Sequence, residues 1–398
     1  MFNRLHCYFW SGFLFSLTAH ASFIESTIGT AIVNDATATY YNPAALVLIK
    51  NKQFIALGSL GQSDSRFTGE AKQVRTGFSQ SGTTYTRLNY LLPSGYYAMP
   101  IKSNWRLGLS VVANDFNKDF DSFSLLRYAQ SNNKIENIDF VPAIAYKINE
   151  NISLGVGLNR SYAHFLLKPV SGLPRFNIPD AESLNESSAE AFGGDVGLLL
   201  KPTKATLLGF NYRSSMTFRM SGTSTFNGVR KISSDNYHFN YWIPARSAFS
   251  ISHFMTKKFG LVGTAQYIQW NIFKDNTIYN IATAAGIISA VKVAYYLHNS
   301  WLLTAGSNYH FSKNWIIRVA GSYVQSPSNG KHQIDHGDSL TLGASMAFTP
   351  FERLTVDLSY AHAFFKSKNI NILNAQNVIN GIDKASVDGI SLKLTVNI

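Results

Sequence analysis

Cysteine is almost absent from the chain. The sequence has one cysteine in 398 residues, Cys7, and it falls within a segment typical of a secretory signal peptide. That segment, residues 1–21, has a positive charge at Arg4, then a short apolar stretch, and ends in Ala19-His20-Ala21. Cleavage there would leave a mature chain that begins at Ser22 and contains no cysteine, which excludes disulfide bonds and thiol chemistry. The alternative is that residues 1–21 are the N-terminus of a cytosolic protein.

Charge and long apolar runs are also scarce. Charged residues make up 15% of the chain, against about 25% in typical soluble domains. The most apolar stretch of the mature chain, Ile281–Leu297, contains Lys292 and is shorter than the roughly 20 residues that a membrane-spanning helix needs. We therefore expect no transmembrane helix. We expect Ile281–Leu297 to belong to an extracellular loop that can form a helix.

The charge that is present is mostly positive. The formal net charge is +12, and strongly basic chains often bind nucleic acid. A secreted chain rarely meets nucleic acid, however, and the densest group of cations is only Lys257-Lys258. We therefore expect no nucleic-acid partner. In an outer membrane, basic loops would instead lie beside lipid and anionic lipopolysaccharide.

Most of the chain alternates between apolar and polar residues. At the C-terminus, one face carries Ile390, Leu392, Leu394, Val396 and Ile398, and the residues between them are polar. Alternation of this kind predicts strands with one apolar face. It does not choose between a soluble β-sandwich and a membrane barrel, because both folds show it.

The connections between the strands favour the barrel. Short polar turns such as Lys102-Ser103-Asn104 and Asn149-Glu150-Asn151 alternate with long irregular stretches such as 61–87 and 168–191. Outer-membrane barrels combine short periplasmic turns with longer extracellular loops in this way, and an even strand number keeps both ends of the barrel on the periplasmic side. The sequence predicts an all-β fold, a 14-stranded antiparallel transmembrane β-barrel in the outer membrane of a Gram-negative bacterium. The predicted strands lie near 52–61, 87–100, 104–114, 134–147, 151–166, 191–201, 205–221, 239–255, 259–273, 300–311, 314–326, 338–349, 353–366 and 386–398.

The tryptophans fit this interpretation. Trp105 and Trp315 follow short turns, whereas Trp242, Trp270 and Trp301 lie beside long stretches. Two groups at opposite ends of the strands predict two aromatic girdles at the two surfaces of a membrane.

The face that should point into the barrel has little bulk and little charge. A water-filled porin usually has denser charge at its constriction, so small inward residues indicate room for a plug or an apolar ligand. The small inward residues are Gly155, Gly157, Gly197, Gly209, Gly306, Gly343 and Ser345, and the inward charges are Asp139, Asp195, Arg213, Arg246, Arg318, Asp357 and Lys393.

Residues 22–50 do not alternate, and they precede the first predicted strand. They contain many small residues and the turn-forming triplet Asn42-Pro43-Ala44. A segment in this position can fold back into the lumen as a hatch. The chain is thus predicted to consist of a signal peptide (1–21), an N-terminal hatch (22–50) and a transmembrane barrel (51–398).

These segments resemble the FadL-type outer-membrane transporters of long-chain fatty acids and other hydrophobic compounds. Near the N-terminus, GTAIVNDATATYYNPAAL is similar to the hatch motif of that family, with Asp35, Asn42, Pro43 and Ala44 at motif positions. Six later segments resemble strands of the family in the same order, so the resemblance covers essentially the whole mature chain. These segments are LLPSGYYAMPIKSNWRLGLSVVAND, FVPAIAYKINENISLGVGLN, LGFNYRSSMTFRMSGTSTF, YIQWNIF, WIIRVAGSYVQSPSN and LTVDLSYAHAF.

The resemblance implies a route for the ligand. In the family, extracellular loops capture the ligand, a lumenal site receives it, and it leaves sideways through a gap made by a kink in the third strand. The matching strand here runs near Trp105–Phe116. The chain departs from the family at its last residue, Ile398, where an aromatic residue is usual, and in the region of the lateral opening. In that region the residues Val112, Ala113, Asn114 and Phe116 stand where the family often has Ala/Ser-Pro-Phe-Gly.

A fatty acid makes two demands on the lumen. Its chain of about 16 carbons gains roughly 12 kcal/mol on leaving water, so it needs apolar sites. Its carboxylate needs a cation, because burying it unpaired costs several kcal/mol. By strand parity Arg318 points inward and is the first candidate for the head-group partner, with Arg246 and Arg213 in reserve. The alternative is that Arg318 pairs with an inward acid, Asp357 or Asp195, and only braces the wall.

No motif predicts catalysis, a metal or a cofactor. His332 and His336 have a spacing that would suit a helix, but their context predicts a loop before a strand. We therefore expect a monomeric transporter that is not an enzyme. A structural or adhesive barrel that binds host or phage stays open as an alternative, and so does uptake of aromatic hydrocarbons. A polar-solute porin fits less well, because the hatch would block it.

Overall fold

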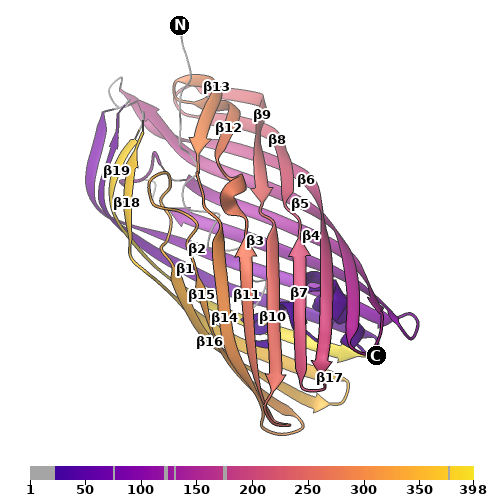
Figure 1. Ribbon diagram of the computed structural model, residues 1–398. Coiled ribbons are helices and arrows are strands. Elements are labelled where there is room, and N and C mark those ends of the chain that lie inside the picture. The colour runs from indigo at the N-terminus through magenta and orange to yellow at the C-terminus, as the bar shows by residue number, and fades with distance from the viewer. Residues whose placement is uncertain (1–22, 75–76, 121–123, 130, 174–176, 375–376) are drawn as a thin grey trace.

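The strands of the chain close into one antiparallel barrel, and short N-terminal helices lie inside it (Figure 1). The computed structural model describes residues 23–74, 77–120, 124–129, 131–173, 177–374 and 377–398, so the predicted signal peptide lies outside the described residues. The described strands are β1 (Gln53–Gln73), β2 (Phe78–Pro100), β3 (Trp105–Phe120), β4 (Ser131–Lys147), β5 (Ile152–Leu173), β6 (Ile178–Thr203), β7 (Thr206–Arg213), β8 (Met216–Asn227), β9 (Lys231–Ile243), β10 (Arg246–Phe254), β11 (Phe259–Ile268), β12 (Asp275–Thr283), β13 (Gly286–Ala294), β14 (Ser300–His310), β15 (Trp315–Val324), β16 (Ser339–Phe351), β17 (Leu354–Phe365), β18 (Lys368–Leu373) and β19 (Asn377–Asn397).

The first and last strands close the sheet. β1 pairs with β19 along its whole length, with Gln53 opposite Asn397 and Gln73 opposite Asn377. The short connections and the C-terminus lie at one end of the barrel, which we call the turn end, and the long hairpins lie at the other, which we call the loop end (Figure 1).

The prediction of a 14-stranded barrel is confirmed for the part of the chain that the structure describes. Some barrel strands consist of two segments. β7 and β8 form one strand that breaks at Ser214-Ser215, and β9 and β10 form another that breaks at Pro244-Ala245. A proline has no N–H to donate to a neighbouring strand, so a break at Pro244 is expected.

The predicted facing of the strands is also confirmed. On β19, Leu392 is 45% exposed on the outer surface, whereas the adjacent Lys393 is 2% exposed and points into the barrel. The described chain has no helix that is long and apolar enough to cross a membrane.

The long irregular stretches, in contrast, are mostly strand. β1 continues to Gln73 and β2 starts at Phe78, so the stretch 61–87 is an extended hairpin. A helix in Ile281–Leu297 is wrong, because this stretch belongs to the β12–β13 hairpin, with Ile281 opposite Ile288. The alternation of apolar and polar residues weakens where the strands extend beyond the apolar belt. Backbone hydrogen bonds between the strands do not need this alternation and continue there.

The helices of the N-terminal segment occupy the turn half of the lumen. They are α1 (Phe23–Ile28), η1 (Thr30–Ile32), α2 (Ala38–Tyr41) and η2 (Pro43–Leu48). Another short helix among the described residues, η4 (Trp270–Ile272), follows β11. In Figure 1 the N-terminal helices lie between the walls near the C-terminus. We keep the name hatch for residues 22–50, of which the structure describes 23–50.

The two aromatic girdles are only partly as predicted. Trp105 and Trp301 are exposed on the outer surface. The placement of Trp270 in a girdle is wrong, because η4 turns this residue inward and leaves it only 2% exposed. Trp242 is partly buried and lies against the ring of Phe273.

Candidate functional site

Asn42 holds the hatch in its folded shape and ties it to the wall. Its side-chain Nδ2 donates to Ala31 O at 2.6 Å and to Leu198 O of β6 at 3.3 Å. Its Oδ1 accepts a hydrogen bond from Ala44 N at 3.1 Å, and Pro43 starts helix η2 directly after it. Asn42 therefore joins two hatch segments and one strand.

The small inward residues make room for this docking. A Cβ atom at Gly155 would collide with Ala44 N, and a Cβ atom at Gly197 would collide with Asn42 Oδ1. Gly209 faces Ala31 O in the same way. The backbone of the hatch thus approaches the wall more closely than any residue with a side chain would allow.

A buried ion cluster joins the hatch to the last strand. Lys393 Nζ of β19 donates to Asp35 Oδ2 at 2.9 Å and to Glu25 Oε1 at 3.2 Å. Burial raises the pKa of the Glu25 carboxyl, although Lys393 opposes this shift. Burial also disfavours the charge of Asp35, but the Lys393 ammonium and the bonds from Thr37 outweigh it and lower the pKa of Asp35. One ammonium therefore serves two carboxylates at this contact.

Two of the three candidate head-group cations are paired with acids. Arg318 Nη1 donates to Asp357 Oδ2 at 2.8 Å, which is the arrangement that the alternative interpretation of Arg318 described. Arg213 Nε donates to Asp195 Oδ1 at 2.7 Å, and its Nη2 donates to Tyr40 O of the hatch at 2.7 Å. Both guanidinium groups are buried and already have a carboxylate partner.

Arg246 differs from the other two. In the part of the chain that the structure describes, it forms no ion pair, and its side chain is only partly buried. Its guanidinium lies 5.6 Å from the ring centroid of Tyr40, whose hydroxyl donates to Asp139 Oδ2 at 3.0 Å. A cation with free hydrogen-bond donors thus lies on the loop side of the hatch.

Above Arg246, the lumen is apolar. Buried side chains from strands on several sides of the barrel and from the β12–β13 hairpin pack together there, and we call this group the outer cluster. Its aromatic members include Phe165, whose ring centroid lies 4.8 Å from that of Tyr241. The main-chain partner of Arg246 on β11 is Ile268, a member of the cluster, so the cation lies at its base. The members of the outer cluster are Leu88, Leu92, Ile135, Ala163, Phe165, Leu167, Ala191, Met216, Phe218, Met220, Tyr237, Phe239, Ile268, Trp270, Phe273, Ile278, Ile281, Val291, Val293, Tyr295 and Leu297.

The sequence contains a signal for the outer cluster, but the apolar outward faces of the strands make this signal hard to recognise. In β8 the inward positions are Met216, Phe218 and Met220, and in β9 they include Tyr237 and Phe239. Barrel interiors are usually polar, so large apolar residues at inward positions of neighbouring strands indicate an apolar binding region.

The wall is interrupted between β2 and β3. The β2–β3 ladder pairs Leu91 with Asp115 and Ser94 with Val112, but skips the two residue pairs between them. Those pairs contain Pro93, which has no N–H to donate. β3 itself stays paired with β4 from Trp105 to Lys118.

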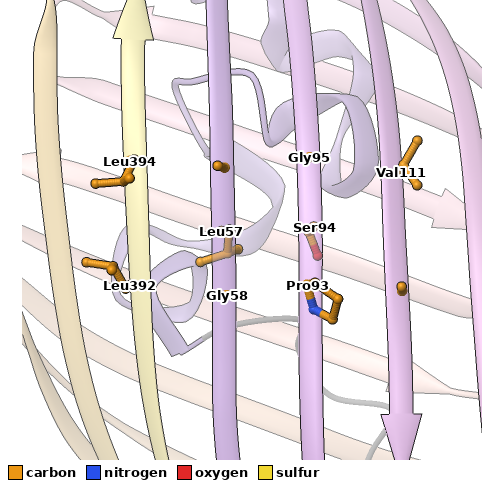
Figure 2. Close-up of a pocket in the computed structure, with 10 residues that line it drawn as sticks. Leu57, Gly58, Pro93, Ser94, Gly95, Val111, Leu392 and Leu394 are labelled. Atoms are coloured by element: carbon orange, nitrogen blue, oxygen red, sulfur yellow. The ribbon is translucent and has the colours of Figure 1, made fainter.

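A groove lies on the outer surface at this interruption (Figure 2). It has a volume of about 510 Å³. It is open because small residues occupy its floor: a Cβ atom at Gly58 or Gly95 would meet nothing within 4 Å. The lining residues are Ala56, Leu57, Gly58, Pro93, Ser94, Gly95, Val111, Ala113, Leu392 and Leu394.

The predicted lateral-opening residues lie at or near this groove. Ala113 lines it, and the buried Val112 next to it packs against the hatch. The backbones of Asn114 and Phe116 belong to β3, but their side chains lie outside the described residues.

The two histidines with helical spacing have separate partners. His336 Nδ1 lies 2.7 Å from Asp383 Oδ2, whereas the ring of His332 lies against Tyr296. Among the described residues, no group of three or more potential ligands is placed to hold a metal ion.

Comparison with known proteins identifies the family. Residues 27–397 match the family described as outer membrane protein transport protein (OMPP1/FadL/TodX). The outer membrane protein P1 of Haemophilus influenzae is 22% identical, over 87% of this chain and 84% of that protein. The long-chain fatty acid transport protein of Escherichia coli O6:H1 is 21% identical, over 83% of this chain and 82% of that protein.

Solved structures show the same fold. A Pseudomonas aeruginosa FadL homologue superposes with a TM-score of 0.81 at 20% identity, over 100% of this chain and 99% of that chain. The Pseudomonas putida toluene transporter TodX superposes with a TM-score of 0.73 at 13% identity, over 99% of this chain and 100% of that chain. The chain therefore belongs to the OMPP1/FadL/TodX family of outer-membrane transporters of hydrophobic compounds in Gram-negative bacteria.

Proposed function

We propose that the protein takes up long-chain fatty acids, which bind in the outer cluster with the carboxylate at Arg246. The observation that carries this proposal is the position of Arg246. It is a cation without an ion pair in the described chain, and it lies at the base of an apolar region. A fatty acid has the matching shape, an anionic head on an apolar chain.

The energetics favour an anionic amphiphile over a neutral ligand at this site. The arginine fork can donate two hydrogen bonds to one carboxylate, and a charged hydrogen bond contributes about 1.5–3 kcal/mol. The apolar chain then gains about 0.8 kcal/mol for each CH₂ that leaves water for the outer cluster. A neutral hydrocarbon would gain only the second contribution, and it would leave Arg246 desolvated and unpaired.

The proposed exit is lateral, through the wall between β2 and β3. Leu92 belongs to the outer cluster, and the next residue, Pro93, lines the groove on the outer surface. The bound chain and the membrane are thus separated at this point by the backbone of one strand, where the ladder to β3 is interrupted. An exit at this level would release the fatty acid into lipid and would not need the hatch to leave the barrel.

The experiment compares palmitate with hexadecanol, which has the same chain length but no charge. We expect Arg246→Gln to weaken palmitate binding to the purified barrel by about ten- to a hundredfold, and hexadecanol binding by less than about threefold. Arg219→Gln is the matched control, because Arg219 is an exposed arginine on the outer surface of the neighbouring strand β8. Equal losses for acid and alcohol would contradict a head-group role for Arg246.

A second candidate ligand class is aromatic hydrocarbon, and the aromatic rings of the outer cluster favour it. Phe165, Phe218 and Phe239 lie close together there. A structural neighbour is named as a toluene transporter. Toluene uptake into cells that express the protein, unchanged by Arg246→Gln and faster than palmitate uptake, would favour this class. An adhesive barrel would bind neither ligand.

A further inference from the structure

Two cations face each other directly on the outer surface of the barrel. Arg66 on β1 is paired across the ladder with Lys384 on β19, and both side chains are exposed. Neither forms an ion pair among the described residues. Like charges directly opposite each other on neighbouring strands destabilise a sheet, and an anion held between them would remove that cost.

A third cation lies close by, and the local charge is positive. Arg87 on β2 is opposite Asp64, the residue two positions before Arg66 on the same face of β1. Arg87 Nε lies 2.8 Å from Asp64 Oδ1, and the other oxygen of Asp64 accepts a hydrogen bond from Gln62. Both oxygens of this carboxylate are thus occupied. We call Arg66, Arg87 and Lys384 the outer cation patch.

Cations on the outer surfaces of β4 and β5 are arranged differently. On β5, Arg160 lies 2.7 Å from Glu190 of β6, and on β4, Lys134 lies 2.6 Å from Glu136. There the protein neutralises its own surface charge. Arg66 and Lys384 differ from these cations, because among the described residues neither forms an ion pair.

Neighbouring residues place the patch at the outer surface of the membrane. Tyr85, opposite Arg66 on β2, is 67% exposed. Phe364 of β17 is also exposed and is paired with Ser386, two residues from Lys384. Below them the outward residues are apolar, as at Leu60 and Ile390. Outward aromatic residues above an apolar belt mark the level of the lipid head groups.

We propose that the outer cation patch binds a phosphate group of lipopolysaccharide in the outer leaflet. The chemistry favours phosphate, because the planar arginine fork presents two parallel donors to its oxygens and Lys384 adds a point charge. This lipid lies on the same level as the patch in a Gram-negative outer membrane and carries phosphates on its innermost sugars. The inference does not depend on the ligand that the barrel transports.

The test measures binding of hexa-acylated lipid A to the purified, detergent-solubilised barrel by native mass spectrometry. The three probes are bisphosphorylated lipid A, monophosphoryl lipid A and inorganic phosphate. We expect the Arg66→Gln, Lys384→Gln double variant to bind bisphosphorylated lipid A about tenfold or more weakly than the unaltered protein. Arg160→Gln, an outward arginine outside the patch, should stay within about twofold. Arg66→Lys keeps the charge but loses the planar fork, so its affinity for bisphosphorylated lipid A should lie between those of the double variant and the unaltered protein.

Several outcomes would overturn the proposal. Equal affinity of the double variant and the unaltered protein would show that the patch does not bind lipid A. Displacement of lipid A by millimolar inorganic phosphate would show that the site takes free phosphate instead. Unchanged palmitate binding in the double variant is expected, and a loss there would show that the substitutions disturb the barrel rather than a lipid site.

Discussion

At the scale of single residues, the lumen contains two kinds of cation. Most of them stabilise the structure by pairing with carboxylates, whereas Arg246 is open to a ligand. Arg213, Arg318 and Lys393 are all buried with carboxylates, and removing one partner of such a pair typically destabilises a protein by about 3–5 kcal/mol. Strand parity predicts the inward direction of these side chains. It leaves open which inward acid Arg318 pairs with, because Arg318 on β15 and Asp357 on β17 reach each other across β16.

Glu25 should make the docking of the hatch depend on pH. Its pKa is raised from 4.5 by burial, so the docked hatch holds a proton that a released hatch gives up. Docking should therefore weaken as pH rises above about 4.5 and through the raised value. The lowered pKa of Asp35 acts in the opposite direction, but only below its ordinary value of 3.8. We expect protease cleavage of the hatch to become faster as pH rises above about 4.5.

The variant Glu25→Gln should remove most of this rise of the cleavage rate with pH, because an amide has no proton to lose in that range. Glu352→Gln, in an exposed turn between β16 and β17, is the control and should keep it. The same slope in Glu25→Gln and in the unaltered protein would mean that other groups set the pH dependence.

At the scale of elements, prolines lie at several places where a ladder skips residue pairs, and two of these places are comparable. Pro93 interrupts β2–β3 beside the groove, and Pro142 interrupts β4–β5, where Phe140 pairs with Arg160 and the next pair is Ala143 with Gly157. The two interruptions are alike in length but differ in place. Only the first has an outer-cluster residue, Leu92, on its inner side and the groove on its outer side.

This pair of prolines gives a matched test of lateral exit. We expect Pro93→Ala to restore an N–H to β2, to strengthen the pairing with β3 and to slow palmitate uptake several-fold, with little change in palmitate binding. Pro142→Ala should leave uptake unchanged. Uptake by cells and binding by the purified protein are the two measurements, and equal effects of both substitutions on uptake would contradict an exit at β2–β3.

The sequence predicts the strands better than it predicts their ends. Alternation identifies each barrel strand where one face meets lipid, as in β19 around Leu392. Toward the loop end the outward face of β1 is polar, as at Asp64, Arg66 and Thr68. Alternation therefore places the end of β1 near residue 61 and the start of β2 near residue 87, although the two strands stay paired as far as Gln73 and Phe78. The motif Asn42-Pro43-Ala44 predicts the hatch, but its contacts to Gly155 and Gly197 depend on the closed barrel and cannot be read from spacing.

At the scale of the whole molecule, the first and last described strands close the barrel, although the loop-end segments β13 and β18 each pair with one strand only. The longest-range pairing, β1 with β19, runs the full length of both strands. In a membrane the backbone must pair within the protein, so a closed barrel resists partial unfolding.

The purified protein should therefore migrate faster on a denaturing gel before boiling than after it. Its mass should be that of a chain that begins at Ser22, because residues 1–21 have the features of a signal peptide. Edman sequencing or intact mass measurement checks the N-terminus, and a boiled control shows the unfolded position. A single band at one position under both conditions, or a retained Met1, would contradict this expectation.

The contact of Lys393 with Glu25 and Asp35 has a consequence for the order of assembly. The cation that secures the first residues of the hatch is carried by β19, the same strand that closes the barrel against β1. A chain without β19 lacks both the partner that closes β1 and the ammonium that contacts Glu25 and Asp35. Closure of the barrel wall and docking of the hatch are thus completed in the same step. A chain truncated before β19 can therefore neither close its barrel nor secure the hatch inside it.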